Sequence, residues 1–177
     1  MRIGEREYLL TNGKRKHSET IREMEIDDLA AVYHLGEKLF TSEELPILYR
    51  TWDSHEVTEF FTADAEYCLV AEVNDTLAGF ILANTIIKPG TAWKRYGYLA
   101  WIGIDETYQG RGLGERLYRK LEEKLRADGV RMTICDTQAA NDRAIRFFEK
   151  LGFGDEVEHI WLTKTFKNRR KTPSDKQ

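Results

Sequence analysis

The stretch that decides the fold is residues 96–127, which reads YGYLAWIGIDETYQGRGLGERLYRKLEEKLRA. Its first part, residues 96–104, carries no charge, which is typical of a strand inside a sheet. Its last part predicts a helix over residues 113–127, because leucines recur there every four residues, at Leu113, Leu117, Leu121 and Leu125. Gly110 and Gly112 stand between the two, and Gly114 lies in the first turn of the helix. The stretch therefore predicts a buried strand, a glycine loop and an amphipathic helix, in that order.

The glycine loop, Gln109-Gly110-Arg111-Gly112-Leu113-Gly114, has the chemistry of an anion site. Glycines let backbone N–H groups turn toward a ligand, and the start of a helix adds unpaired donors and a positive dipole end. Such a site suits a pyrophosphate, to which Arg111 and Arg116 can add charge. The alternative is a tight connection without a ligand. A P-loop is disfavoured because no lysine follows Gly114, and a dinucleotide fold because Asp128 lies in a turn.

The sequence before this stretch predicts a first strand over residues 20–24 and helices over residues 27–39 and 54–61. Residues 42–52 form a short helix or a loop. A hairpin follows, with strands at 67–73 and 77–87 and Asn74-Asp75 as its turn.

After the helix we expect a strand at 132–137, a helix at 142–151 and one or two closing strands between 152 and 166. The whole order predicts an α/β (α+β) fold, with helices on both faces of a sheet. We expect an arm at residues 1–19, one domain at 20–166 and a polar tail at 167–177.

Composition narrows the class of protein. Hydrophobic residues make up 41% of the 177 and charged residues 32%, and the formal net charge is −3. These values predict a soluble domain that does not bind nucleic acid or membranes. We expect a monomer or a homodimer. The only cysteines, Cys68 and Cys135, have no metal spacing, so we expect no metal. A charged N-terminus without an apolar signal core predicts a cytoplasmic protein.

Two motifs resemble the GNAT superfamily of N-acetyltransferases. The segment from Gln109 to Gly114 resembles the family's loop for the pyrophosphate of acetyl-coenzyme A (acetyl-CoA). Residues 141–153, NDRAIRFFEKLGF, resemble its Asn-x-x-Ala-x-x-Phe-Tyr-x-x-x-Gly-Phe segment. The similarity covers roughly residues 20–166 and is strong after Tyr96. It implies a mixed sheet of about six or seven strands whose two central parallel strands splay apart, and acetyl-CoA as the cosubstrate.

The resemblance also implies which residues bind acetyl-CoA. The backbone of Ile102, Gly103 and Ile104 would hold the pantetheine arm, and an amide near Ile102 would stabilise the thioester oxyanion. The loop amides would hold the pyrophosphate. Asn141 would bind pantetheine, although an asparagine there also suits a helix N-cap. Phe148 stands where the family has a tyrosine that protonates the departing thiolate, which phenylalanine cannot do.

The acceptor amine must lose a proton, because only about one free lysine amine in a thousand is neutral at pH 7. The family places a glutamate on the central strand, but residues 96–102 contain no carboxylate. Some protein N-terminal acetyltransferases have a tyrosine that matches Tyr98 and a polar residue that matches Asp136. We therefore expect these two to orient a water that takes the proton. The alternatives are that Tyr98 forms a wall of the acceptor tunnel and that Asp136 caps a strand end or forms an ion pair there. Cys135 is expected to be packed, not an acetyl carrier.

The acceptor stays open. Acidic and aromatic residues between the first helices suggest a rim for a cationic amine, or else a solvated helix face: Glu37, Glu43, Glu44, Asp53, Glu56 and Glu59 with Tyr49 and Trp52. Trp93 and Tyr96 are candidates for the opposite wall. Three functions remain: an acetyltransferase for a peptide or protein amine, one for a small amine such as a polyamine or aminoglycoside, or an acetyl-CoA sensor with little catalysis.

Overall fold

A computed structural model describes residues 18–40, 51–157, 160, 162, 164 and 166. The chain falls into two compact units, Met1–Asp136 and Thr137–Gln177. Each unit is described by itself.

The first unit contains all five strands of the described residues. They are β1 (Glu19–Glu23), β2 (Leu69–Val73), β3 (Thr76–Lys88), β4 (Lys94–Ile104) and β5 (Thr133–Cys135). Its helices are α1 (Leu29–Leu39), α2 (Ser54–Asp64) and α3 (Leu113–Ala127), with short 3-10 turns η1 (Ile26–Asp28), η2 (Ala65–Tyr67) and η3 (Glu106–Tyr108).

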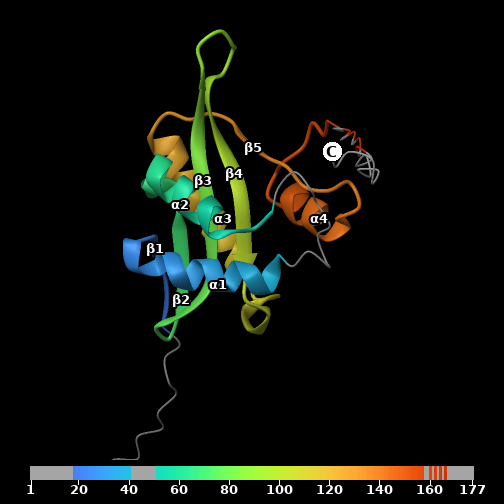
Figure 1. The fold of residues 1–177 in the computed structure, drawn as a ribbon. Coiled ribbons are helices and arrows are strands. Elements are labelled where there is room, and N and C mark those ends of the chain that lie inside the picture. The colour runs from blue at the N-terminus through green and yellow to red at the C-terminus, as the bar shows by residue number, and fades with distance from the viewer. Residues whose placement is uncertain are drawn as a thin grey trace, which may run out of the picture. The chain divides into compact units, whose positions relative to one another are not determined.

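The strands form one mixed sheet in chain order, β1-β2-β3-β4-β5 (Figure 1). Neighbours from β1 to β4 are antiparallel, and β4 and β5 are parallel. A parallel pair needs a crossover connection, which α3 supplies. The uncharged strand predicted from the sequence is β4, and it lies inside the sheet as expected.

Helices cover both faces of this sheet (Figure 1). On one face, α1 and α2 pack on β2, β3 and β4 around a core that includes Val32, Val57 and Phe80. On the other face lies α3, whose Leu117 and Leu125 side chains come close to the glycines of β3 and β4. The four leucines of the predicted stripe are all buried.

Local sequence explains the turns that join these elements. Asn74 and Asp75 both have positive φ, which is the geometry of the two-residue turn that fits the twist of a hairpin. At the end of α3, Gly129 has a φ of +75°. Its amide donates to Arg126, and the amide of Val130 donates to Leu125, which forms a Schellman cap.

The structure confirms most predicted elements and shifts some ends. The bounds of α3 agree with the prediction. Strand β2 begins only at Leu69, because Tyr67 lies in a 3-10 turn. Strand β5 is three residues long, where six were predicted. The described residues hold five strands instead of six or seven, and the closing strands were expected in residues 152–166, of which only part is described. Residues 41–50, with most of the predicted second helix or loop, lie outside the described residues.

The second unit contains the helix α4 (Asp142–Lys150). Gly152, with a φ of +95°, ends it, and the amide of Phe153 returns to the carbonyl of Phe148. The predicted helix over residues 142–151 is thus confirmed.

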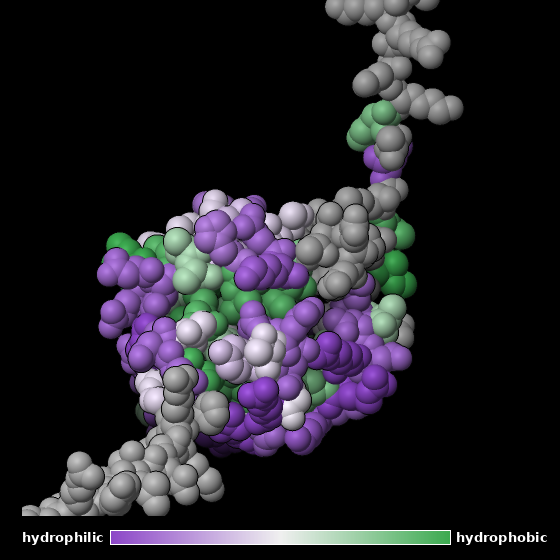
Figure 2. Space-filling view, turned by 90° about the horizontal axis from the view of Figure 1, so that it is seen from below, coloured by the Kyte–Doolittle hydropathy of each residue, from purple (hydrophilic) through white to green (hydrophobic). Residues whose placement is uncertain are grey.

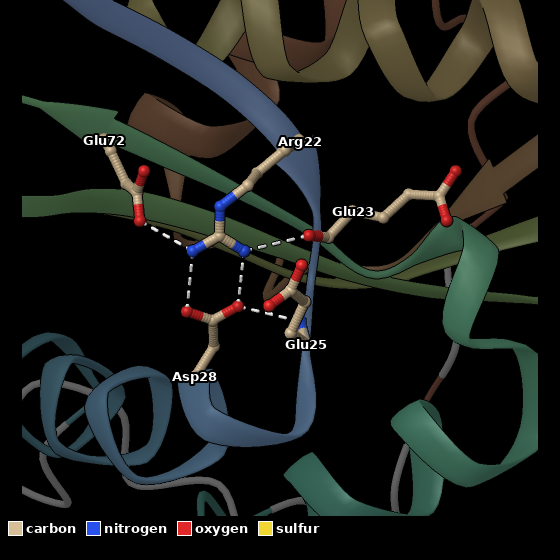
Figure 3. Close-up of polar contacts among 5 residues, drawn as sticks. All are labelled: Arg22, Glu23, Glu25, Asp28 and Glu72. Atoms are coloured by element: carbon tan, nitrogen blue, oxygen red, sulfur yellow. Dashed lines mark hydrogen bonds and ion pairs between the residues drawn. The ribbon is translucent and has the colours of Figure 1, made fainter. Parts of the chain in front are cut away.

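An arginine ties the first strand to its surroundings (Figure 3). The Arg22 guanidinium donates to both carboxylate oxygens of Asp28, at 2.6 and 2.9 Å, and to Glu72 at 2.6 Å. The amide of Glu25 also donates to Asp28, at 2.7 Å. These bonds join β1, the turn before α1 and β2. The bond from Arg22 is the main reason why the pKa of Asp28 lies below its ordinary value of 3.8.

The Asp28→Asn variant should therefore be less stable at neutral pH, by about 1–3 kcal/mol. A carboxyl whose pKa is lower in the folded state stabilises the fold above its unfolded pKa and loses this effect as pH falls through the folded pKa. The stability difference between the wild type and the variant should thus shrink on acidification below pH 3.8. Urea unfolding of both proteins at neutral and acid pH measures this, and a difference that stays constant would contradict it.

The surface seen from the lower end of Figure 1 is mainly hydrophilic, with a band of apolar residues (Figure 2). Large exposed apolar side chains of the first unit include Ile26, Ile87 and Trp93. None of the helices in the described ranges has the length and apolar character that a membrane span requires.

Candidate functional site

Strand β4 contains a β-bulge in its middle. Leu82 of β3 pairs with Trp101, and Ala83 pairs with Leu99, so Ala100 has no partner on β3. An extra residue of this kind changes which backbone groups face each neighbouring strand. The sequence carries no signal for it, because Ala100 lies within an uninterrupted apolar run.

Beyond the bulge, alternate residues of β4 turn their backbone away from β3. The amide of Asp105 donates to Ala78 of β3, at 2.9 Å, so Gly103, two residues earlier, also faces β3. Ile102 and Ile104 then face the other side. A hydrogen bond supports this orientation of Ile104, because Nε2 of Gln109 donates to the Ile104 carbonyl at 2.8 Å.

The pairing of β4 with β5 is short. It runs only from Gly97–Thr133 to Leu99–Cys135, while β4 continues to Ile104. The two parallel strands therefore part directly after Leu99 and Cys135. The backbone of Ile102 and Ile104 faces this splay, by which we mean the divergence of β4 and β5 beyond these two residues.

A hydrogen-bonded pair of side chains marks the point where the strands part. Tyr98 lies on β4 and Asp136 directly follows β5, and the Tyr98 hydroxyl donates to Asp136 Oδ1 at 2.7 Å. Asp136 is exposed, and Tyr98 is half-buried. A carboxylate accepts about four hydrogen bonds, so this bond leaves capacity for a water. The structure thus brings together the two residues that the sequence analysis singled out for proton transfer.

The neighbouring thiol is poorly suited to carry an acetyl group. Burial, with the charge of Asp136 as a smaller cause, raises the pKa of the Cys135 thiol to about 12. The reactive form of a cysteine is the thiolate, which this pKa makes rare at neutral pH.

The glycine loop follows β4 and begins α3. Gly110 and Gly112 have φ values of +73° and +74°, a conformation that most side chains disfavour. Gly112 is the N-cap of α3 and has no side chain to cap it, so the amides of Leu113 and Gly114 face the position where a solvent molecule or an anion can bind. Residues 110–112 are exposed. This geometry fits the predicted anion site.

The two arginines near the loop differ in their surroundings. Arg116 forms an ion pair with Glu19 of β1, with Nε–Oε1 at 2.6 Å, and it donates to the carbonyl of Arg111 at 2.9 Å. The charge of Arg116 is therefore matched by Glu19, and its hydrogen bond to Arg111 supports the glycine loop. The guanidinium of Arg111 lies 5.9 Å from the centre of the Tyr108 ring.

The second unit carries the other two candidate residues. Asn141 caps α4, because its Oδ1 accepts from the Ala144 amide at 3.1 Å. This cap does not use the Nδ2 group. Phe148 is 8% exposed and contacts the rings of Phe147 and Phe153, each at 5.3 Å between centroids.

The expected acidic and aromatic rim is only partly present. Trp52 was assigned to it wrongly: it is 9% exposed and belongs to the core, and its Nε1 donates to the Tyr33 carbonyl at 2.9 Å. Gly36 makes room for this ring, because a Cβ there would lie 2.0 Å from it. Glu43, Glu44 and Tyr49 lie outside the described residues.

The remaining acidic residues of that rim have separate roles. Glu37 accepts from Tyr33 at 2.7 Å and lies 2.9 Å from the His34 ring nitrogen. Asp53 caps α2 by accepting from two amides. Glu56 accepts from the indole Nε1 of Trp101, at 2.7 Å. The sequence carries no signal for this last contact, which joins α2 to β4.

Comparison with known proteins identifies the family. The model of the Acetyltransferase (GNAT) family matches residues 30–153.

No group of three or more His, Cys, Asp or Glu that could hold a metal ion occurs in the part of the chain that the structure describes.

Relatives from several organisms share this similarity. N-alpha-acetyltransferase 30 of Schizosaccharomyces pombe is 28% identical over 88 residues, which is 50% of this chain and 57% of that protein. The [ribosomal protein bS18]-alanine N-acetyltransferase of Escherichia coli is 26% identical over 136 residues, covering 77% of this chain and 81% of that protein. The solved aminoglycoside N-acetyltransferase AAC(6')-Iy in complex with CoA has a TM-score of 0.67 at 21% identity, with 85% of this chain and 97% of that chain covered.

Proposed function

Since the chain belongs to the GNAT acetyltransferase family, we propose that it transfers the acetyl group of acetyl-CoA to a primary amine of a peptide or protein. The acceptor is a lysine side chain or an N-terminal amine, which attacks the thioester directly while both substrates are bound. The observation that carries this proposal is the Tyr98–Asp136 hydrogen bond of 2.7 Å where β4 and β5 part. Two relatives, one named an N-alpha-acetyltransferase and one an alanine N-acetyltransferase of a ribosomal protein, support a peptide or protein acceptor.

The residues present fit acetyl-CoA. In this proposal the glycine N-cap at Gly112 lets the amides of Leu113 and Gly114 bind the pyrophosphate, and Gln109, Gly110 and Arg111 complete the loop. The pantetheine arm pairs with the backbone of Ile102 and Ile104, which faces the splay. Gly103 faces β3, so its part is to let β4 pack closely on Leu39 and Phe80. Asn141 and Phe148, which belong to the second unit, remain predicted acetyl-CoA-binding residues, and the cap on α4 leaves Nδ2 of Asn141 for this role.

Asp136 serves as the base in this mechanism. It accepts the amine proton through a water that Tyr98 helps to orient, and the amine then attacks the thioester carbon. The amide of Ile102 stabilises the oxyanion that forms. The bond to the CoA sulfur breaks, and a proton from solvent restores the thiol.

The Phe148→Tyr variant tests whether departure of the thiolate limits turnover. A CoA thiol with a pKa of about 8.5 leaves readily without help, so we expect the maximal rate to change by less than about threefold. A tenfold gain, which corresponds to about 1.4 kcal/mol of barrier, would contradict this. Steady-state kinetics answers the question, provided that a melting curve shows the variant to be folded, since Phe148 is buried between two rings.

A small amine is the second candidate acceptor, because the fold also resembles that of an aminoglycoside acetyltransferase. The sensor function remains as a third, because Phe148 lacks the family's hydroxyl. Release of free thiol from acetyl-CoA, measured with a panel of peptides, polyamines and aminoglycosides, separates the three. Turnover only with peptides supports the proposal, turnover only with small amines favours the second candidate, and binding of acetyl-CoA without turnover favours the sensor.

We also propose a reducing, cytoplasmic location, which the two free cysteines, Cys68 and Cys135, support. The expected monomer or homodimer stays a prediction.

A further inference from the structure

We infer that Glu56 binds a second positive charge on the acceptor, so that the enzyme prefers amines that carry another cationic group. This inference rests on the proposed function and specifies its substrate class. The group recognised is an ammonium or guanidinium ion, whether it belongs to a basic peptide or to a small polyamine.

Helix α2 places Glu56 above the strand that carries Tyr98. Glu56 and Phe60 are four residues apart and therefore share one side of the helix. Glu56 Oε2 accepts from Trp101 Nε1 at 2.7 Å, and the Phe60 ring lies 6.5 Å from the Tyr98 ring between centroids. These two contacts lay α2 along residues 98–101 of β4, where the bulge lies and the splay begins.

No cation among the described residues matches the charge of Glu56. A carboxylate can accept about four hydrogen bonds, and the Trp101 indole takes one. Within the described ranges no lysine, arginine or histidine forms an ion pair with Glu56, whereas Glu59, on the same helix, has His55 at 3.9 Å. Glu56 is half-buried, so solvent compensates its charge less than it does at an exposed site.

The hydrogen bond alone does not explain a carboxylate at this position. A neutral amide oxygen would satisfy the indole N–H equally well and would avoid the cost of a partly buried charge. The negative charge of Glu56 has a use if the acceptor carries a cationic group that pairs with it. Residues of a strand are about 3.3 Å apart, so Trp101 and Tyr98 are on the order of 10 Å apart along β4. This separation suits two amines at the ends of an extended side chain or short polyamine.

The Glu56→Gln variant tests this inference, because glutamine keeps an oxygen for the Trp101 indole and removes only the charge. Two pairs of acceptors are compared: cadaverine with pentylamine, and a peptide that begins Ala-Lys with one that begins Ala-norleucine. For the dicationic member of a pair, KM should rise about tenfold while kcat changes little. For the monocationic member, KM should stay within about twofold of the wild type.

Glu59→Gln is the matched control. Glu59 was expected in the acidic rim, but it is exposed and lies 3.9 Å from His55 on its own helix, so removing its charge should leave every KM unchanged. An effect in the peptide pair alone assigns the second charge to a peptide, and an effect in the amine pair alone assigns it to a small polyamine. Equal changes for both members of each pair, or no change at all, would overturn the role of Glu56.

A binding experiment keeps this test independent of turnover. Titration calorimetry of spermidine into the CoA-loaded protein should give a dissociation constant about tenfold weaker for Glu56→Gln than for the wild type. If no amine is acetylated, the proposed function fails, while the calorimetry still decides on Glu56. Equal affinities in the two proteins would then refute the inference.

Discussion

The Asp136→Asn variant should lower turnover per folded molecule by roughly ten- to a thousandfold, within or just below the usual range for general base catalysis. The physical reason is the protonation of the acceptor, since only about one free lysine amine in a thousand is neutral at pH 7, and an N-terminal amine is also mostly protonated there. Strand β4 carries no carboxylate between residues 96 and 102. Asp136, which accepts the Tyr98 hydroxyl at 2.7 Å, is the carboxylate that the structure places where β4 and β5 part. Asparagine keeps its shape and its bond to Tyr98 but cannot take a proton.

Three measurements on one preparation separate this role from a structural one. Turnover should fall, affinity for acetyl-CoA should stay nearly the same, and the melting temperature should change little. Asp136 is exposed, so its charge contributes little to the fold. Tyr98→Phe is the matched control, because it removes the hydrogen bond and keeps the carboxylate, so its loss should be smaller. Full turnover in folded Asp136→Asn would exclude Asp136 as the base.

Elements with local signals were predictable from the sequence. The glycine before α3, the leucines every fourth residue and the Asp128-Gly129 ending define this helix without help from the rest of the chain. The hairpin at Asn74-Asp75 is equally local, because these residues tolerate the positive φ that its turn needs. The contact between Tyr98 and Asp136 was predicted from the spacing of the motifs. This spacing is informative because two adjacent parallel strands have a nearly fixed register once the crossover helix is placed.

Features that depend on packing between distant segments were not predictable. The bulge at Ala100 arises from the register of β4 on β3, and an apolar run contains nothing that marks one residue as unpaired. It decides that Ile102 and Ile104, and not Gly103, face the splay. Arg116 looked like a ligand for phosphate, but Glu19, which lies 97 residues away in sequence, matches its charge. Trp52 was predicted to lie in a rim, because the sequence does not show that its ring packs against Gly36. That packing site exists only once α1 has formed.

The Gly112→Asp variant should bind acetyl-CoA so weakly that the ligand no longer raises the melting temperature. A ligand at a hundred times its dissociation constant stabilises a protein by about 2.7 kcal/mol, and this shift should disappear. Gly112 is the N-cap of α3, so a carboxylate there would lie beside the amides that hold the pyrophosphate and repel its charge. Wild-type protein should show a clear shift under the same conditions.

Gly112→Asn is the control that isolates charge from shape. Both substitutions place a side chain at a φ of +74°, which aspartate and asparagine tolerate better than most residues. Both also bring a Cβ to 3.1 Å from Arg116 Nη1, so any disturbance of the bond from Arg116 to Arg111 is shared. Asparagine should therefore weaken binding less than aspartate, and the difference between them measures repulsion of an anion. If folded Gly112→Asp kept the full ligand-induced shift, the pyrophosphate would have to bind elsewhere, because a new negative charge at the start of α3 opposes a bound anion there.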